Sequence, residues 1–202
     1  MSLSVLLSLL ALSFGTMADF EVEVGGSSSC AVSDGMAKCW GLNRFGQLGY
    51  EDTATRLEPS DEPIDLGSEF IVDSVHISYS HACAISTSDQ LKCWGNGLGA
   101  GTGDFRGNIG DSAGEMGDNL EVLSFENVDD VMTLYRVTCV LSGGEVDCFG
   151  YDNWITGRSV KTAADPVTLD LGDFEAVSLG GGMLTVCAIS NNENDEAEQL
   201  KC

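Results

Sequence analysis

Basic side chains are scarce in this chain. Its 202 residues include 9 lysines and arginines against 32 aspartates and glutamates, so the formal net charge is −23. A field of that sign repels phosphate backbones and anionic lipid headgroups, which argues against nucleic acids and acidic membranes as partners. It favours a basic protein partner or a cation. The alternative is that the acidity only keeps the protein soluble.

Long apolar runs are also missing, apart from one at the start of the chain. Residues 1–18 carry no charge, contain an apolar run from Leu3 to Phe14, and end in small residues ahead of Asp19. This pattern predicts a signal peptide, and hence a secreted or extracytoplasmic protein with no membrane insertion after cleavage. The segment lacks the usual basic residue, so an uncleaved anchor is the alternative, although the run is short for a bilayer.

Motifs of the common catalytic sites are absent. The chain has no strand-to-helix Gly-x-Gly-x-x-Gly sequence and no Walker lysine, so nucleotide binding lacks support. Its two histidines, His76 and His81, accompany neither a serine elbow motif nor a His-Glu-x-x-His helix. The sequence therefore predicts no enzyme, no catalytic residue, no cofactor and no metal site.

Eight cysteines form four pairs, and they are the most informative residues present. The second members, Cys39, Cys93, Cys148 and Cys202, lie 54, 55 and 54 residues apart. The first members, Cys30, Cys83, Cys139 and Cys187, follow a looser spacing of 53, 56 and 48 residues. A nearly constant period predicts a repeat architecture, in which each unit buries its apolar face only against a neighbour.

The spacing within the first pair is that of a β-hairpin. Asp34–Gly35 lies at the centre of Cys30–Cys39 and suits the two positive φ values of a type I′ turn. Counting outward, the two cysteines occupy a non-hydrogen-bonded position, where Cα atoms approach to about 4.5 Å and a disulfide can form. Cys139–Cys148 repeats this design around Gly143–Gly144.

The other two pairs enclose longer loops. Cys83–Cys93 fits a three-residue loop, Thr87–Asp89, that ends in a left-handed residue. Cys187–Cys202 encloses the polar insertion Asn191–Glu198. Four disulfides within hairpins are therefore predicted. Zinc binding is the alternative, but its pairs are usually two to four residues apart; a thiol nucleophile beside His81 would lack a third, orienting group.

The remainder of each unit is strand-like. Alternating segments precede the first cysteine of each pair, at residues 20–24, 72–77, 131–134 and 174–179. An aromatic residue and a glycine follow the second cysteine in Trp40–Gly41, Trp94–Gly95 and Phe149–Gly150. The aromatic ring would fill the space between sheets, and the glycine would allow the backbone to bend or approach another segment.

These motifs resemble the regulator-of-chromosome-condensation repeat family, in its extracellular, disulfide-containing variety. The resemblance rests on Cys30–Gly35, Lys38–Asn43 and Gly46–Gly49 in the first unit, on Cys83–Ile85 and Leu91–Gly99 in the second, and on Cys139–Leu141 and Cys148–Gly150 in the third. Trp154–Gly157 departs from the glycine motif. Members of this family form β-propellers, typically with seven four-stranded blades, so the resemblance implies an all-β fold.

The expected architecture is a partial β-propeller of four-stranded antiparallel blades. The expected boundaries are 19–69 for blade 1, 70–125 for blade 2, 126–172 for blade 3 and 173–202 for an incomplete blade 4. Because three full units and part of a fourth do not complete a seven-bladed ring, we expect a fragment of a longer chain. A partner chain that completes the ring is the alternative.

Blade 2 contains a glycine-rich acidic segment, residues 101–119, which we expect to be a loop. Its four carboxylates belong to Asp104, Asp111, Glu115 and Asp118. Hard cations prefer such oxygen ligands, so a calcium site is an alternative to a purely structural connection. The spacing matches no EF-hand loop.

Rigid blades that carry variable loops favour a non-catalytic protein-binding module. The loop residues expected to contact a partner are Arg44, Phe45, Asp104, Phe105, Arg106, Tyr151 and Trp154. The alternative that the resemblance implies is guanine-nucleotide exchange on a small GTPase, the founding activity of the family. The signal segment, the disulfides and the net charge oppose that nuclear role.

Overall fold

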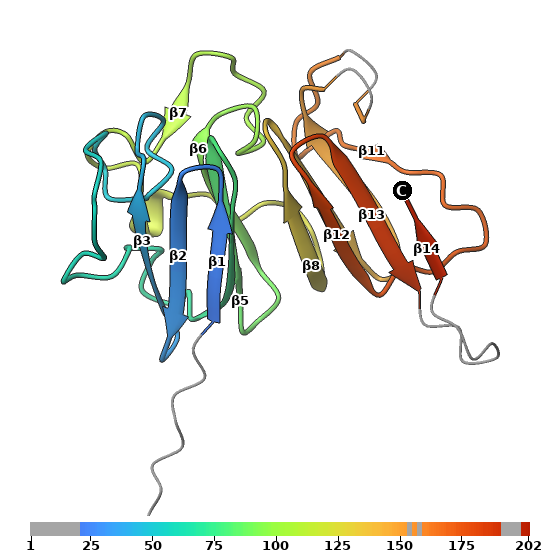
Figure 1. Cartoon of the computed structure of the whole chain (residues 1–202), viewed down its shortest axis with the longest axis horizontal. Coiled ribbons are helices and arrows are strands. Elements are labelled where there is room, and N and C mark those ends of the chain that lie inside the picture. The colour runs from blue at the N-terminus through green and yellow to red at the C-terminus, as the bar shows by residue number, and fades with distance from the viewer. Residues whose placement is uncertain (1–20, 153–154, 157–158, 191–198) are drawn as a thin grey trace, which may run out of the picture.

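The computed structural model describes residues 21–152, 155–156, 159–190 and 199–202, and shows four antiparallel sheets side by side (Figure 1). The predicted signal peptide, the insertion at 191–198 and Trp154 lie outside the described residues. No helix within the described ranges is long and apolar enough to cross a membrane.

Each sheet is a simple meander, in which strands that follow one another in the chain are paired. The first holds β1 (Glu21–Gly25), β2 (Ser28–Ser33) and β3 (Met36–Gly41). The second holds β4 (Val72–Ile77), β5 (His81–Ser86), β6 (Leu91–Asn96) and β7 (Asn108–Ile109). The third holds β8 (Val128–Thr133), β9 (Val137–Ser142), β10 (Glu145–Gly150) and β11 (Val167–Thr168). The fourth holds β12 (Ser178–Gly182), β13 (Thr185–Ser190) and β14 (Gln199–Lys201). The innermost strands β1, β4, β8 and β12 are neighbours in that order.

The predicted disulfides and hairpin registers are confirmed. Cysteines face each other in Cys30–Cys39, Cys83–Cys93, Cys139–Cys148 and Cys187–Cys202, with Cα–Cα distances of 4.1, 4.0, 4.1 and 4.0 Å. The turn residues Asp34 and Gly35 have φ values of 53° and 74°, and Asp89 has a φ of 57° at the end of its loop. Turn chemistry therefore sets the register that brings each cysteine pair together.

Three local expectations need correction. Residues 174–179 are mostly not strand, because β12 begins at Ser178; Phe174 and Ala176 alternate because they are buried against the third sheet. The strand expected at 131–134 begins earlier, at Val128. Residues 101–119 are not only a loop, since they supply β7 and the 3-10 helix η1 (Gly117–Asn119).

Aromatic residues fill two of the spaces between sheets, as predicted. Trp94 is fully buried between the first and second sheets, and its indole N–H donates to the Gln47 carbonyl at 3.0 Å. Phe149 is fully buried between the second and third sheets and stacks on Phe125, with ring centroids 5.9 Å apart. Each ring makes two repeats share one apolar core, which stabilises both blades.

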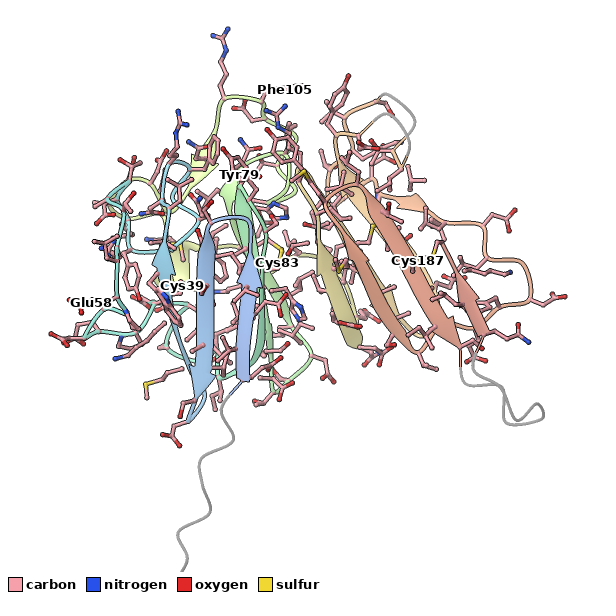
Figure 2. The ribbon with its side chains drawn as sticks, in the orientation of Figure 1. Cys39, Glu58, Tyr79, Cys83, Phe105 and Cys187 are labelled. Carbon is pink, nitrogen blue, oxygen red and sulfur yellow. A yellow bond between two sulfur atoms is a disulfide. The ribbon has the colours of Figure 1, made fainter. Side chains whose placement is uncertain are left out.

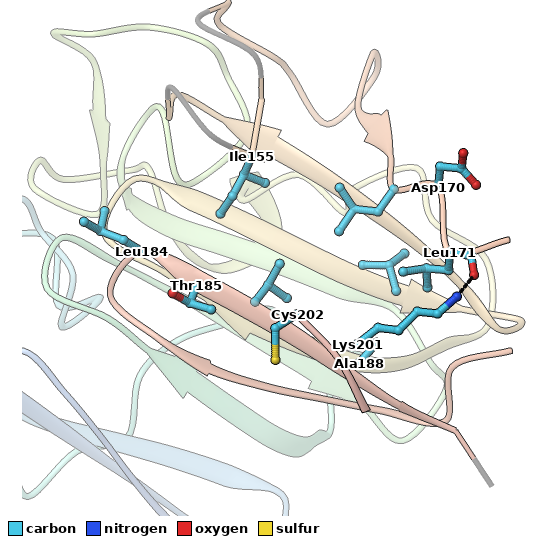
Figure 3. A pocket seen from close by; sticks show the side chains of 11 residues that line it. Ile155, Asp170, Leu171, Leu184, Thr185, Ala188, Lys201 and Cys202 are labelled. Carbon is cyan, nitrogen blue, oxygen red and sulfur yellow. Dashed lines mark hydrogen bonds between the residues drawn. The ribbon is translucent and has the colours of Figure 1, made fainter. Parts of the chain in front are cut away.

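The space between the third and fourth sheets is not filled in this way. A cavity of about 470 Å³ lies there, with Ile155 and Leu171 on one wall and Ala188 and Cys202 on the other (Figure 3). Ala188 follows the first cysteine of its hairpin, as Ala84 does in the second sheet, where that alanine belongs to the Trp94 cluster. The cavity thus occupies the position of the interblade aromatic ring.

A candidate protein-binding face

Aromatic rings from three successive sheets touch at one end of the strands. Phe45 follows β3, Tyr79 lies in the β4–β5 turn, and Tyr135 lies in the β8–β9 turn. The ring centroids of Phe45 and Tyr79 are 6.3 Å apart, and those of Tyr79 and Tyr135 are 5.4 Å apart. Figure 2 shows Tyr79 at the upper end of the sheets. We call these three residues the aromatic ladder.

A second aromatic pair continues the ladder. Phe105 and Tyr151 meet edge to face, with centroids 5.3 Å apart, and Phe105 lies at the same upper end (Figure 2). The Tyr151 backbone N–H donates to the Arg136 carbonyl at 3.0 Å, and the Arg136 guanidinium lies 5.0 Å from the ring centroid of Tyr135. We define the aromatic face as the surface formed by Arg44, Phe45, Tyr79, Phe105, Arg106, Tyr135, Arg136 and Tyr151.

A buried glutamine positions the first ring of the ladder. Gln47 is fully buried; its side-chain oxygen accepts the Phe45 backbone N–H at 2.9 Å, and its side-chain nitrogen donates to the Tyr79 carbonyl at 3.2 Å. The glycine motif Gly46–Gly49 that contains Gln47 thus connects Phe45 to Tyr79. Because a buried polar group is costly without partners, these bonds fix the geometry.

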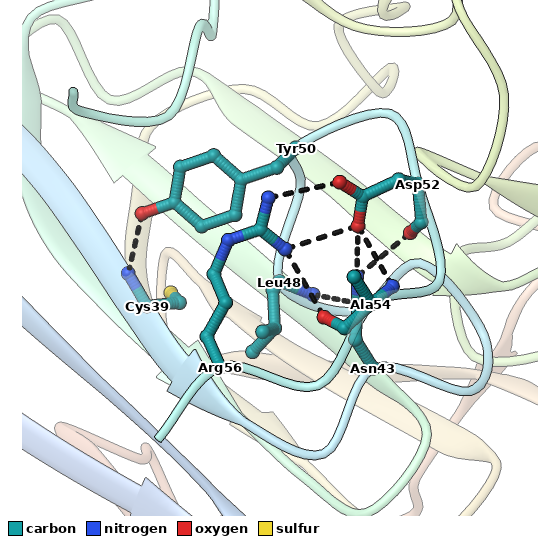
Figure 4. Close-up of polar contacts among 7 residues, drawn as sticks. All are labelled: Cys39, Asn43, Leu48, Tyr50, Asp52, Ala54 and Arg56. Atoms are coloured by element: carbon teal, nitrogen blue, oxygen red, sulfur yellow. Dashed lines mark hydrogen bonds and ion pairs between the residues drawn. The ribbon is translucent and has the colours of Figure 1, made fainter. Parts of the chain in front are cut away.

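A polar network holds the loop after β3 in place (Figure 4). The Asn43 amide donates to the Asp52 carboxylate at 3.0 Å, and its oxygen accepts the Leu48 N–H at 2.9 Å. Arg56 forms an ion pair with Asp52 at 2.9 Å and stacks over the Tyr50 ring at 4.2 Å. The Arg56 bond is the main cause that lowers the pKa of Asp52. The loop bearing Arg44 and Phe45 is therefore preorganised.

The turns of the ladder are tied to each other. Ser80 donates its hydroxyl to the Tyr135 carbonyl at 2.6 Å, and the Tyr135 N–H donates to the Met183 carbonyl at 3.2 Å. Gly26 has a φ of +62°, and a Cβ there would lie 2.6 Å from the Tyr79 Cα. A recess of about 280 Å³ lies among Gly26, Tyr79, Tyr135 and Met183.

The aromatic face also holds unpaired cations. Among the described residues, no carboxylate lies within 4.0 Å of the guanidinium of Arg44, Arg106 or Arg136. The other described basic residues have partners of two kinds. Arg56 and Lys161 form ion pairs with Asp52 and Asp165. The ammonium groups of the three lysines outside those ion pairs donate hydrogen bonds to backbone carbonyls: Lys38 to Asp61, Lys92 to Leu66, and Lys201 to Leu171. What sets Arg44, Arg106 and Arg136 apart among the described basic residues is that their guanidinium groups have neither kind of partner.

Acidic residues gather toward the opposite end of the innermost strands. Glu21 begins β1, Asp73 is the second residue of β4, and Asp130 is the third of β8. Burial, followed by the charges of Asp73 and Asp130, raises the pKa of Glu21. Burial, followed by the charges of Glu21 and Asp130, raises the pKa of Glu23. Glu21 and Glu23 therefore lie close enough to other acidic groups for those charges to raise their pKa values.

The structure brings most of the predicted contact residues together. Arg44, Phe45, Phe105, Arg106 and Tyr151 all belong to the aromatic face. Asp104 lies in the same loop as Phe105, but its carboxylate accepts the Arg106 backbone N–H at 2.8 Å. That bond, followed by one from Gly107, lowers the pKa of Asp104. Trp154 lies outside the described residues.

Sequence reasoning missed the centre of the face. Tyr79 and Tyr135 were not expected to be contact residues, nor was Met183, whose side chain is 62% exposed. All three stand four residues before the first cysteine of a hairpin, the position that Gly26 holds in the first unit. The cysteine period therefore contained a signal for this set, since equivalent positions of successive blades lie side by side.

The four carboxylates considered for calcium do not converge. Glu115 accepts the backbone N–H groups of Gly110, Asp111 and Ser112, and Asp118 accepts that of Ser68. In the described part of the chain, no three histidine, cysteine or acidic side chains are placed to hold a metal ion. These acidic side chains instead organise the segment by accepting backbone hydrogen bonds.

Comparison with known proteins supports the fold. No family model matches the chain. The human and mouse E3 ubiquitin-protein ligase HERC2 are each 25% identical over 183 residues, which is 85% of this chain but 4% of those proteins. Human WBSCR16 superposes with a TM-score of 0.62 at 21% identity, over 85% of this chain and 45% of that one. Prp20p from Saccharomyces cerevisiae gives a TM-score of 0.64 at 18% identity, over 82% of this chain and 42% of that one. The chain thus spans less than half of these structures, and the four disulfide-clamped sheets form part of an RCC1-like β-propeller.

Proposed function

We propose that this chain is a non-catalytic protein-binding module that acts in a secretory or extracellular compartment and binds its partner through the aromatic face. The aromatic ladder carries this proposal, because three half-buried rings from three sheets are in contact at the turns. Tyrosine and arginine are the residue types most enriched where interfaces gain their binding energy.

The rigidity of the blades supports binding rather than a structural role alone. Each hairpin that precedes or follows a contact turn is closed by a disulfide, and Gln47 and Ser80 fix the backbone around the ladder. A preorganised surface loses less conformational entropy when it binds, so more of the contact energy appears as affinity.

Disulfides support the proposed compartment. All cysteines of the chain are bonded, and such bonds persist in oxidising environments. If residues 1–18 are a signal peptide, N-terminal sequencing of exported protein will begin at Asp19. The same bonds disfavour the alternative of nucleotide exchange on a cytosolic or nuclear GTPase, which draws its support from the resemblance to the repeat family.

Solved relatives of this fold are described with protein partners. Prp20p binds Gsp1p and histones, and it has been solved in complex with Kap60. At 18% and 15% identity these relatives share the fold, so they support a protein as the class of partner and do not identify it.

Site-specific photocrosslinking tests the proposal. A photoreactive phenylalanine analogue replaces Phe105 in one variant and Tyr79 in another, in full-length protein made in its own host. Glu58, an exposed residue far from the face, is the control position (Figure 2). We expect a discrete crosslinked protein from positions 79 and 105 and none from position 58. Equal crosslinking at all three positions, or none at 79 and 105, would contradict the proposal.

A further inference from the structure

We infer that the partner presents an acidic segment to the aromatic face, with carboxylates that pair with Arg44, Arg106 and Arg136. This inference rests on the proposed function, and it names the chemistry of the partner. It assigns to this face a charge preference opposite to the one expected from the net charge of −23. A basic partner remains a prediction for the acidic end of the strands.

The three arginines are exceptional in so acidic a chain. Acidic residues outnumber basic ones 32 to 9, and the described Arg56 and Lys161 have formed ion pairs within four residues along the chain. Arg44 and Arg106 are exposed, Arg136 is half-buried, and among the described residues none of the three guanidinium groups has an acidic partner within 4.0 Å. Guanidinium groups bind carboxylates through two parallel hydrogen bonds, so these positions suit acidic side chains of a partner.

The Asp104 carboxylate forms no ion pair with these arginines, although, after the backbone hydrogen bonds from Arg106 and Gly107, the charge of Arg106 also lowers the Asp104 pKa. Asp104 lies two residues from Arg106, but its carboxylate accepts backbone N–H groups of Arg106 and Gly107 and forms no ion pair. The Arg106 guanidinium therefore stays available to a partner.

Distance weakens the repulsion from the acidic residues at the far end of the strands, whereas Glu23 itself lines the recess beside Tyr79 and Tyr135. β4 and β8 each have six residues, and a strand rises about 3.3 Å per residue, so the two ends are roughly 15–20 Å apart. At physiological ionic strength the screening length is about 8 Å. The electrostatic interaction of far-end acidic groups such as Asp73 with the arginines is therefore weak.

The aromatic rings of this face predict that the partner segment also carries an apolar side chain. Tyr79 and Tyr135 form the middle of the face, and Arg136 stacks on Tyr135 at 5.0 Å. The recess of about 280 Å³ beside them has room for one large side chain. The expected segment therefore carries aspartate or glutamate on both sides of an aromatic or aliphatic anchor.

Selection from a random peptide library tests the inference. The oxidised full-length protein is the target, and the selected peptides are synthesised and measured by fluorescence anisotropy. We expect enrichment of acidic residues flanking an apolar one. Each of Arg44→Gln, Arg106→Gln and Arg136→Gln should weaken binding about tenfold, and the triple variant on the order of 100-fold or more. Lys38→Gln, which removes a basic residue away from the face, should leave binding unchanged.

The outcomes separate this inference from the proposed function. If the peptides are basic or uncharged, yet lose binding on Tyr79→Ala and Tyr135→Ala, the face binds protein and the inference is wrong. If no peptide is enriched, or if neither tyrosine substitution changes the peptide affinity, both the proposed function of the aromatic face and the acidic-segment inference are wrong. Competition by a single-stranded oligonucleotide that depends on the three arginines would show a phosphate site, and would also overturn the acidic-peptide inference.

Discussion

His81 of β5 and Thr138 of β9 join two neighbouring sheets through a hydrogen bond of 2.8 Å between Nε2 and Oγ1. The Thr138 hydroxyl donates its own proton to the Gly99 carbonyl at 2.8 Å, so the imidazole must donate from Nε2. Nδ1 is then an acceptor that faces the Ser78 hydroxyl at 3.0 Å, and this hydroxyl shares its one proton between Nδ1 and the His81 backbone carbonyl at 3.1 Å. Complete burial lowers the pKa of His81 to about 3, so the ring is neutral in the folded protein.

This histidine makes stability depend on pH. Its folded pKa lies below the unfolded value of 6.5, so the unfolded chain takes up the proton first. Its stabilising contribution is therefore complete above about pH 6.5 and is lost as the pH falls toward 3. We expect urea unfolding to show a loss of about 2 kcal/mol from His81 between pH 7 and pH 5.

Two variants isolate this effect. In a His76→Gln background, His81 is the one remaining histidine, and adding His81→Gln removes it while keeping a donor toward Thr138. The second protein should be less stable at pH 7 by about 1–3 kcal/mol, because Ser78 loses its contact with the ring and keeps only the backbone carbonyl of residue 81. Its stability should change less between pH 7 and pH 5. Equal pH dependence in the two proteins would refute the role of His81.

A buried lysine joins β6 to the loop at Leu66 and to the start of η1 through hydrogen bonds. Lys92 is 5% exposed, and its ammonium donates to the carbonyls of Leu66 at 2.8 Å and Gly117 at 3.1 Å. Burial lowers the pKa of Lys92, while the charges of Asp118 and Asp65 oppose this shift. Lys92→Met leaves both carbonyls without this donor, so we expect a loss of about 2 kcal/mol in the free energy of unfolding.

The fourth sheet offers a matched control for this lysine. Lys201 makes the equivalent bond to the Leu171 carbonyl and lies over the Phe174 ring, as Lys92 lies over Phe70, but Lys201 is exposed. Lys201→Met should cost less than about 1 kcal/mol, because water replaces the lost donor. A similar loss for both variants would contradict the importance of burial at Lys92.

The glycine after the second cysteine permits close contact between backbones. Gly95 has a φ of +97°, and a Cβ there would lie 2.6 Å from the Cα of His81. Gly114 has a similar φ of +86°, but a Cβ there would meet nothing within 4 Å. Thermal unfolding should show a cost of about 3 kcal/mol or more for Gly95→Ala and about 1–2 kcal/mol for Gly114→Ala. Equal losses of stability in the two variants would mean that the positive φ determines the cost and that the close backbone contact at Gly95 adds nothing.

Sequence predicted the features that depend on local chemistry. Asp34–Gly35 determines its turn, the turn determines the register, and the register brings Cys30 and Cys39 together. Trp94 was likewise expected to fill the space between sheets because it occupies a fixed place in the repeat. These inferences needed only neighbouring residues and the period of the chain.

Features that depend on contacts between sheets were not predictable in the same way. Thr138 lies 57 residues from His81, and Gly117 lies 25 from Lys92, so their hydrogen bonds depend on how blades pack. The contact between Tyr79 and Tyr135 arises from the same packing. The strand expected at 174–179 was misplaced for a related reason, because alternation there reports burial between sheets and not strand pairing.

Disulfide mapping tests the central claim, that every blade is closed by its own bridge and so holds the aromatic face rigid. Non-reducing digestion with trypsin and a glutamate-specific protease can cut within each pair, at Lys38, Lys92, Glu145 and Lys201. Mass spectrometry should then find peptides joined as Cys30–Cys39, Cys83–Cys93, Cys139–Cys148 and Cys187–Cys202, each separating on reduction. Free thiols, or bridges between different sheets, would contradict the account.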